Sequence, residues 1–147
     1  MFTRTAGSGR RNQDSYEAVW EHANNRKLVY SKPRYDAPVI FDPDSFDWTP
    51  AGKGVARKPL GIFTERETRI ETIRLAAGAE WKARAGKAVR LIFVMSGKGK
   101  CGSDAYDRHA LIELGSGEAA SFRAEKETEL LVLAMPLIGA AAGRKPA

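Results

Sequence analysis

From residue 58 onward, short apolar runs alternate with turn signals that recur about every 8–12 residues, the spacing of a β-sandwich or a barrel. The turns contain glycine, and they are Ala77-Gly78, Gly86, Gly97-Lys98-Gly99, Gly102-Ser103 and Gly115-Ser116-Gly117. The runs between them predict strands near 58–64, 68–76, 88–96, 98–102, 109–114, 119–123 and 129–135. This part of the chain is therefore predicted to be all-β.

The chain before residue 58 differs in composition and in the spacing of its apolar residues. Residues 1–13 are polar and rich in glycine and arginine, and we expect them to be flexible. In residues 14–24, apolar side chains recur at helical spacing, with Asp14 or Ser15 as the cap. Prolines keep residues 28–50 extended. Five aromatic side chains in this arm need burial, and they are Tyr30, Tyr35, Phe41, Phe46 and Trp48. The predicted divisions are a flexible N-terminus over 1–13, a helix and arm over 14–57, a barrel over 58–136 and a flexible tail over 137–147.

Composition excludes several kinds of partner. The net charge is +6, but the 24 basic residues are interleaved with 18 acidic ones, so no basic run points to nucleic acid. No apolar run approaches the roughly 20 residues that a membrane helix needs. A single cysteine, Cys101, excludes an internal disulfide and fits a reducing compartment, so we expect the cytoplasm.

Two stretches, LAAGAEWKARAGKAVRLIFVMSGKG and LIELGSGEAASFRAEKETELLVLAMP, resemble the two sequence blocks of cupins. Gly78 and the run from Val94 to Gly99 match the two ends of the first block, and Gly117-Glu118 match the start of the second. The resemblance implies an RmlC-like jelly roll, a double-stranded β-helix, with a short N-terminal helix and an extended arm before it.

The same resemblance places the metal ligands of that family on residues that cannot bind a metal. Its two histidines fall on Ala83 and Ala85 or on Arg84 and Gly86, its glutamate on Arg90, and its third histidine near Thr128. A guanidinium has no lone pair to donate and repels a cation. The chain has only two histidines, His22 and His109. We therefore predict a divergent member without a metal, and no other cofactor.

Arg90 opens an apolar strand, and a buried charge needs a partner. One interpretation is that Arg90 receives the anionic group of a bound small molecule. A second is an internal ion pair with Glu71, Glu127 or Glu129. A third is that Arg90 reaches solvent at the strand end.

His109, at the start of a predicted strand, is the candidate acid or base. Asp107 would share its strand face and, with Tyr106, would orient it. The alternative is a surface histidine beside a turn. Four further residues are candidates for substrate binding, and they are Trp81, Arg84, Arg123 and Thr128. For Trp81 the alternative is a core or interface aromatic.

These features favour a metal-independent cupin enzyme that acts on a small anionic or polyoxygenated metabolite. The reaction would be an isomerisation, a dehydration or a cyclisation by acid/base chemistry, in which Arg90 holds the anion. The alternatives are a non-catalytic barrel that binds or senses a small molecule, and a structural barrel. The resemblance also implies a homodimer, in which the arm packs on its own barrel or crosses to the partner.

Overall fold

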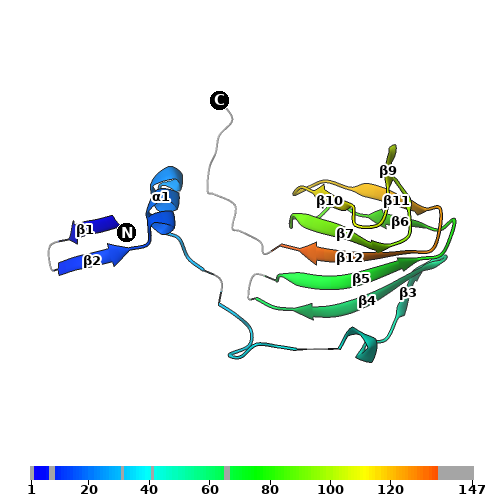
Figure 1. Ribbon diagram of the computed structural model, residues 1–147, viewed down its shortest axis with the longest axis horizontal. Coiled ribbons are helices and arrows are strands. Elements are labelled where there is room, and N and C mark those ends of the chain that lie inside the picture. Colours follow the sequence, from blue (N-terminus) through cyan, green and yellow to red (C-terminus); the bar gives the residue numbers. More distant parts are fainter. Residues whose placement is uncertain (1, 7–8, 31, 41, 65–66, 136–147) are drawn as a thin grey trace. The chain divides into compact units, whose positions relative to one another are not determined.

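The chain folds as two compact units, Met1–Ser31 and Lys32–Ala147. The computed structural model describes residues 2–6, 9–30, 32–40, 42–64 and 67–135 (Figure 1). The tail expected at 137–147 lies outside these residues. No helix in the part of the chain that the structure describes is long and apolar enough to cross a membrane.

The first unit consists of a β-hairpin followed by one helix. Strands β1 (Phe2–Ala6) and β2 (Gly9–Gln13) pair antiparallel, in a stretch where the sequence predicted no regular structure. The sequences of these strands are polar and do not alternate between apolar and polar residues, so their periodicity does not predict a strand. The two strands pair through backbone groups, which do not depend on such a pattern. Helix α1 (Ser15–Asn24) confirms the predicted helix. Asp14 caps its start, and Asn25 ends it in the left-handed conformation with φ of 47°.

Glu21 ties α1 to the chain on both sides of the helix. Its carboxylate accepts hydrogen bonds from Lys27 Nζ at 2.8 Å, Gln13 Nε2 at 2.9 Å and Leu28 N at 3.1 Å. These bonds, Lys27 first, lower the pKa of Glu21 to about 2. Helix α1 buries none of its own residues. Polar contacts rather than an apolar core therefore organise the described side chains of this unit.

The second unit is built from two antiparallel sheets that face each other (Figure 1). The larger sheet has the strand order β10-β7-β12-β5-β4-β3, and the smaller has the order β6-β11-β8-β9. The strands of the larger sheet are β3 (Thr49–Gly52), β4 (Val55–Ile62), β5 (Arg69–Leu75), β7 (Arg90–Ser96), β10 (Leu111–Leu114) and β12 (Thr128–Ala134). Those of the smaller sheet are β6 (Glu80–Ala83), β8 (Gly99–Cys101), β9 (Asp104–Tyr106) and β11 (Ala120–Ala124). The predicted all-β jelly-roll barrel is confirmed.

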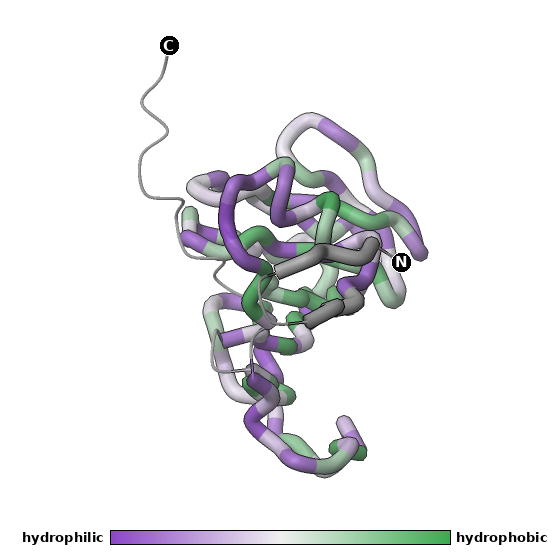
Figure 2. Tube along the Cα trace, turned by 90° about the vertical axis from the view of Figure 1, so that its left-hand side faces the viewer, coloured by the Kyte–Doolittle hydropathy of each residue, from purple (hydrophilic) through white to green (hydrophobic). Residues whose placement is uncertain are grey.

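The space between the sheets is filled by apolar side chains. Along β7, Ile92 and Val94 are fully buried and point inward, while Phe93 faces outward. Phe122 of β11 meets them from the smaller sheet and has no exposed surface. The buried core consists of Val55, Ile73, Leu75, Ala83, Ile92, Val94, Tyr106, Leu114, Phe122, Ala124, Leu130 and Val132. Figure 2 shows hydrophobic and hydrophilic residues in close succession along the chain.

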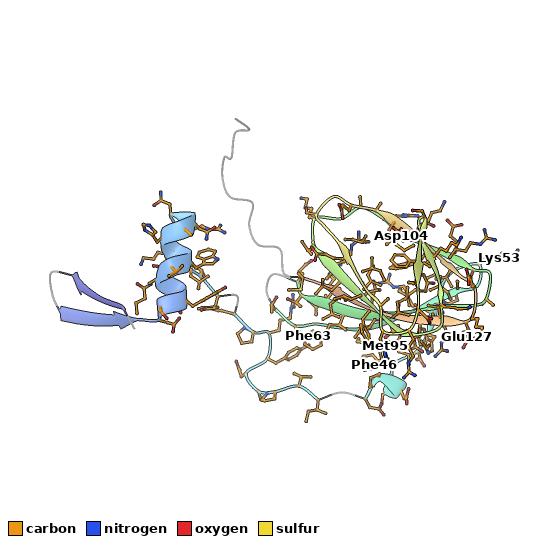
Figure 3. The ribbon with its side chains drawn as sticks, turned by 45° about the horizontal axis from the view of Figure 1, so that its top comes forward. Phe46, Lys53, Phe63, Met95, Asp104 and Glu127 are labelled. Carbon is orange, nitrogen blue, oxygen red and sulfur yellow. The ribbon has the colours of Figure 1, made fainter. Side chains whose placement is uncertain are left out.

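The two ends of the barrel carry different residues. Lys53 and Glu127 lie at one end and Phe63 lies at the other (Figure 3). At the Phe63 end, Arg90 of β7 pairs in register with Ala134 of β12. We call this the arginine end, and the end with Glu127 the glycine end because Gly97 closes β7 there.

The arm that precedes β3 packs on the outer face of the larger sheet. Lys58 Nζ donates a hydrogen bond of 2.8 Å to the carbonyl of Pro43, which begins the short 3-10 helix η1 (Pro43–Ser45). The Trp48 ring lies 4.8 Å from Lys58 Nζ and 4.0 Å from the Arg74 guanidinium. These cation–π contacts fix the last part of the arm on its own barrel.

The burial expected for the aromatic side chains of the arm is only partly realised. Phe46 and Trp48 are half-buried, but Tyr30 and Tyr35 are 66% and 48% exposed. Phe41 lies outside the described residues. The described part of the arm before β3 pairs with the barrel through an isolated bridge between Pro33 and Thr64 rather than through a strand, so it covers its side chains only where it touches the barrel. The expectation of full burial was wrong for the two tyrosines.

Each predicted strand overlaps an observed one, and the differences concern short strands. The sequence missed β6 and β9, which have 4 and 3 residues and lack a long apolar run. The larger sheet also begins at Thr49, earlier than the expected boundary at residue 58, because β3 pairs with β4 across a tight turn at Gly54.

Gly97 should be the glycine that the fold tolerates least when replaced. Its φ is +87°, and a Cβ there would meet the Glu127 carbonyl and lie 2.6 Å from Thr128 Cα. Gly78, with φ of +80°, has nothing within 4 Å of an added Cβ. We expect Gly97→Ala to lower the free energy of unfolding by about 3 kcal/mol and Gly78→Ala by about 1 kcal/mol, measured by urea denaturation. Equal losses would show that the close approach to β12 contributes nothing.

Candidate functional site

Arg90 lies on the inner face of the larger sheet at the arginine end. Its side chain shares that face with the fully buried Ile92, two residues further along β7. Its Nη2 donates a hydrogen bond of 2.7 Å to the backbone carbonyl of Glu118. Its Nε is buried and has no hydrogen-bond partner among the described residues. Arg90 is therefore half-buried and inward-facing, with donor capacity that the protein does not use.

The expected acidic partners of Arg90 are engaged elsewhere or absent. Glu71 pairs with Arg57 at 2.6 Å, and Glu129 pairs with Arg74 at 3.8 Å. No carboxylate of the described residues lies within ion-pair distance of Arg90. The ion-pair interpretation of Arg90 is wrong for this structure, because Arg57 on the neighbouring strand β4 takes the inward-facing Glu71.

A cavity of about 430 Å³ lies against Arg90. We call it the arginine cavity, and its lining is Arg57, Pro59, Gly61, Ile62, Arg69, Ile70, Glu71, Arg90, Val132 and Ala134. Arg69 and Arg90 flank Ala134 in one row across three strands, and the small alanine leaves space between them. Arg69 is itself paired with Glu67 at 2.5 Å. The guanidinium of this cavity without an acidic partner is that of Arg90.

A second cavity, of about 490 Å³, lies where β4 and β5 face β6. We call it the tryptophan cavity, and its lining is Ala51, Arg57, Glu71, Ile73, Glu80, Trp81, Lys82 and Arg84. The Trp81 ring is half-buried and packs on Phe122 with 5.3 Å between centroids. Arg84 is exposed just after β6. Both residues thus line a cavity, as the sequence predicted for a binding role.

The two cavities meet at the ion pair between Arg57 and Glu71, which lines both of them. The pair is partly exposed, with 49% of the Arg57 side chain and 25% of the Glu71 side chain open to solvent. Arg57 uses Glu71 Oε2, so the second carboxylate oxygen of Glu71 has no contact in the described residues. Glu71 is the inward-facing carboxylate nearest to Arg90 in the sheet register, one row away across β12.

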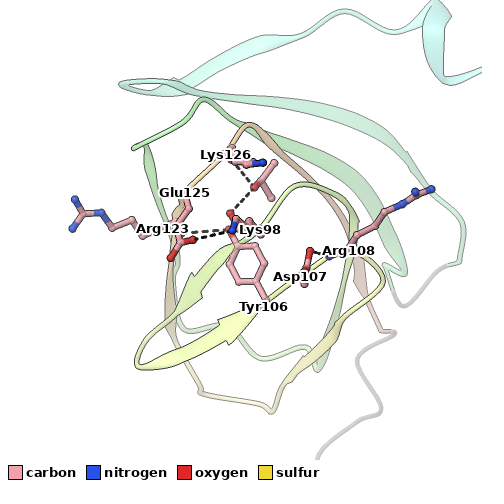
Figure 4. Close-up of polar contacts among 8 residues, drawn as sticks. Lys98, Tyr106, Asp107, Arg108, Arg123, Glu125 and Lys126 are labelled. Carbon is pink, nitrogen blue, oxygen red and sulfur yellow. Dashed lines mark hydrogen bonds and ion pairs between the residues drawn. The ribbon is translucent and has the colours of Figure 1, made fainter.

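Three other candidates gather at the glycine end, away from Arg90. Tyr106 is a buried core residue whose hydroxyl lies 3.5 Å from the Arg123 carbonyl, and burial raises its pKa (Figure 4). Thr128 has no exposed surface, and its hydroxyl donates to the carbonyl of Lys126 at 2.9 Å. Arg123 is exposed on the outer face of the smaller sheet. The structure does not bring these residues to either cavity.

His109 and Asp107 lie in the turn that precedes β10. The strand expected from residue 109 begins instead at Leu111, and His109 has the left-handed φ of 70°. Its ring is exposed and stacks at 5.9 Å on Phe93, which is on the outer face of the larger sheet. Asp107 accepts a hydrogen bond from the backbone amide of Arg108 at 2.7 Å. The expectation that Asp107 and His109 share a strand face was wrong, because a turn replaces the strand there, and the alternative of a surface histidine beside a turn describes His109.

The positions that the cupin resemblance assigns to a metal do not fit one. Ala83 is packed in the core without a donor atom, and Arg84 and Arg90 present cationic donors where a metal needs lone pairs. The Thr128 hydroxyl is turned toward backbone carbonyls. No group of three histidine, cysteine or acidic residues that could hold a metal occurs among the described residues.

The sequence did not identify Arg57 or Glu71 as candidate site residues. Arg57 was placed in the arm, and Glu71 was considered only as a partner of Arg90. A signal existed in the alternation of Glu71, Ile73 and Leu75, which puts the carboxylate on the inner face of β5. For Arg57 the signal was hidden, because a turn at Gly54 begins the barrel before the expected boundary.

Comparison with known proteins gives the fold. No protein-family profile matches the sequence, and no curated protein resembles it. An RmlC-like cupin from Shewanella frigidimarina has a similar structure, with a TM-score of 0.58 and 14% identity over 68% of this chain and 92% of that one. KdgF from Halomonas sp. gives a TM-score of 0.54 and 12% identity over 66% and 95% of the two chains. The complex of Rhodobacter sphaeroides SigE with the anti-sigma ChrR gives a TM-score of 0.55 and 17% identity over 89% and 71%. The barrel has the RmlC-like cupin fold, without the metal-binding histidines.

Replacing Arg90 by methionine should stabilise the protein in the absence of a ligand. The substitution keeps the apolar part of the side chain and removes a buried Nε that has no partner. We expect Arg90→Met to raise the free energy of unfolding by about 1 kcal/mol in urea denaturation. The matched control is Arg57→Met, which strands the Glu71 carboxylate and should lower it by about 1 kcal/mol. A loss of stability in Arg90→Met as large as that control's would assign Arg90 a structural role.

Proposed function

We propose that the barrel binds a small anionic metabolite without a metal and that Arg90 holds its acidic group. The observation that carries the proposal is the Arg90 guanidinium, which borders a cavity of about 430 Å³, has a buried Nε without a partner and faces no carboxylate. A half-buried charge of this kind is costly unless something pairs with it. A carboxylate or a phosphate from a ligand would supply that partner with a charge-assisted hydrogen bond.

The same cavity supports acid/base chemistry on the bound molecule. Glu71 lines the cavity that contains Arg90, and Arg57 holds its carboxylate in place. Glu71 is therefore the proton acceptor that the geometry favours for an isomerase, lyase or cyclase reaction. A role for His109 and Asp107 in this reaction is not favoured, because the ring of His109 lies on the outer face of the larger sheet.

A second candidate function is a sensory barrel that binds the metabolite and passes the signal to a protein partner. The likeness to the SigE–ChrR complex covers 89% of this chain, whereas the likenesses to the Shewanella cupin and to KdgF cover 68% and 66%. The larger coverage extends beyond the barrel toward the first unit, where α1 buries none of its residues. An exposed helix of this kind is suited to contact a partner.

We also propose that the chain forms a homodimer through the outer face of the larger sheet. Leu111 and Met95 are 61% and 46% exposed there, beside half-buried Leu91, Phe93 and Leu131. Exposed apolar patches of this kind mark interaction surfaces, and a twofold pairing buries the same patch on both chains.

The test of the ligand site is isothermal titration with acetate, succinate, citrate and inorganic phosphate at low ionic strength. We expect at least one of these anions to bind, and Arg90→Ala to weaken that binding by roughly 10- to 100-fold. Arg123→Ala removes the same charge from the outer face and should leave the affinity unchanged. Equal affinities in the wild type and Arg90→Ala, or no binding at all, would overturn the proposal.

The test of the homodimer is the substitution Leu111→Lys, which places a charge at the most exposed residue of the apolar patch. We expect the wild-type chain to have the mass of a dimer in light scattering after gel filtration, and the variant to have the mass of a monomer. Lys87→Glu changes a charge outside this patch and should leave the dimer intact. A monomeric wild type would reject the interface.

A further inference from the structure

Most ionisable side chains that line the two cavities have a partner of opposite charge. In the arginine cavity, Arg57 pairs with Glu71 and Arg69 with Glu67, which leaves Arg90 without a carboxylate. All of these residues belong to the part of the chain that the structure describes. The arginine cavity therefore carries one uncompensated positive charge.

The ionisable side chains of the tryptophan cavity give the same result. Glu71 is taken by Arg57, and Glu80 accepts a hydrogen bond of 2.5 Å from Ser121 and lies 3.9 Å from Lys82. Arg84 lines this cavity and has neither an ion pair nor a hydrogen bond among the described residues. The tryptophan cavity thus also carries one uncompensated positive charge, that of Arg84, which does not line the arginine cavity.

The segment between the two free arginines is electrically balanced. The cavities meet at the Arg57–Glu71 ion pair, whose net charge is zero. Apolar side chains continue the wall on both sides of the pair, Ile73 in the tryptophan cavity and Val132 in the arginine cavity. The linings of the two cavities, taken together, thus contain one positive site in each cavity and a neutral ion pair that they share.

From this arrangement we infer that the ligand is an elongated molecule with an acidic group at each end, one held by Arg90 and the other by Arg84. The inference rests on the proposed function, because it takes Arg90 as the first anion site. A compact anion would leave one of the two arginines unpaired, whereas a two-ended dianion pairs both. The middle of the ligand passes the ion pair and contacts Ile73 and Trp81.

The two sites contribute differently to affinity. Arg90 is half-buried and Arg84 is exposed, so water and salt screen the second contact more strongly. Arg90 therefore provides most of the affinity for the first acidic group, and Arg84 determines how much a second acidic group increases the affinity. The second acidic group belongs to the same molecule, so its effective concentration near Arg84 is high and even a weak contact increases the affinity.

The experiment is a calorimetric titration of the full chain with unbranched dicarboxylates from malonate to azelate at low ionic strength. Each dicarboxylate is compared with the monocarboxylate of the same chain length. We expect short dicarboxylates to match their monocarboxylates, and one longer member to bind roughly tenfold more tightly. Arg84→Ala should remove this gain and leave monocarboxylate affinity unchanged, while Arg90→Ala should weaken both series. Lys87→Ala, with the same charge loss outside both cavities, should behave as the wild type.

The outcomes separate the two proposals. If monocarboxylates bind through Arg90 but no dicarboxylate binds more tightly, or if Arg84→Ala keeps the gain, the two-ended ligand is wrong and the anion site stands. If neither series binds the wild type, the anion site fails and the inference fails with it.

Discussion

The burial of Phe122 between the two sheets is the contact on which the rest of the structure depends. It lies on β11, near the centre of the smaller sheet, and it has no exposed surface. Trp81 packs on it at 5.3 Å and Tyr106 at 6.0 Å between ring centroids. Where this aromatic cluster fills the barrel, the facing strands must be apolar, as Ile92, Val94 and Leu130 are.

Beyond the aromatic cluster the larger sheet continues but its inner face changes character. Arg57, Glu71 and Arg90 stand in the same inward-facing rows as the apolar core positions of their own strands. All three border the cavities, so they are not enclosed in the packed core, where an unpaired charge would be costly. This part of the inner face thus adds charged groups to a barrel interior in which the Thr128 hydroxyl is engaged with the backbone.

The sequence predicted those features that depend on alternation and spacing. The barrel and the N-terminal helix follow from patterns of several residues, and such patterns are set by the packing of one face. For Arg90 the sequence left three interpretations open, and it is the structure that puts this residue on the inner face of β7. For Trp81 the sequence left a binding residue and a core aromatic open, and the ring both lines a cavity and packs on Phe122. The failures have local causes: β9 has only 3 residues, and a left-handed turn at His109 reverses the face that strand alternation would give.

Long-range pairing was the part that the sequence did not reveal. Glu71 was one of three possible partners of Arg90 in one of three interpretations, but its partner is Arg57, which the sequence assigned to the arm. The cupin resemblance suggested Thr128 as a substrate-binding residue. The register of β12 instead puts it at the glycine end of the barrel, beside Gly97 and away from Arg90. Which charges meet across a sheet depends on register and strand order, and neither is encoded in the composition of a single strand.

The proposed function gives the arginine the same kind of ligand group that a metal centre attracts. A metal ion needs neutral or anionic donors around it, and the resulting centre attracts the oxygen atoms of a ligand. A guanidinium attracts the same oxygen atoms directly, so under this proposal Arg90 would act in place of a complete metal centre rather than of the glutamate whose position it occupies. The two centres differ in the reactions that they support once a ligand is bound. A guanidinium orients a carboxylate and stabilises developing negative charge, yet it accepts no electron pair and changes no oxidation state. Chemistry supported by Arg90 and Glu71 alone is therefore restricted to binding and proton transfer.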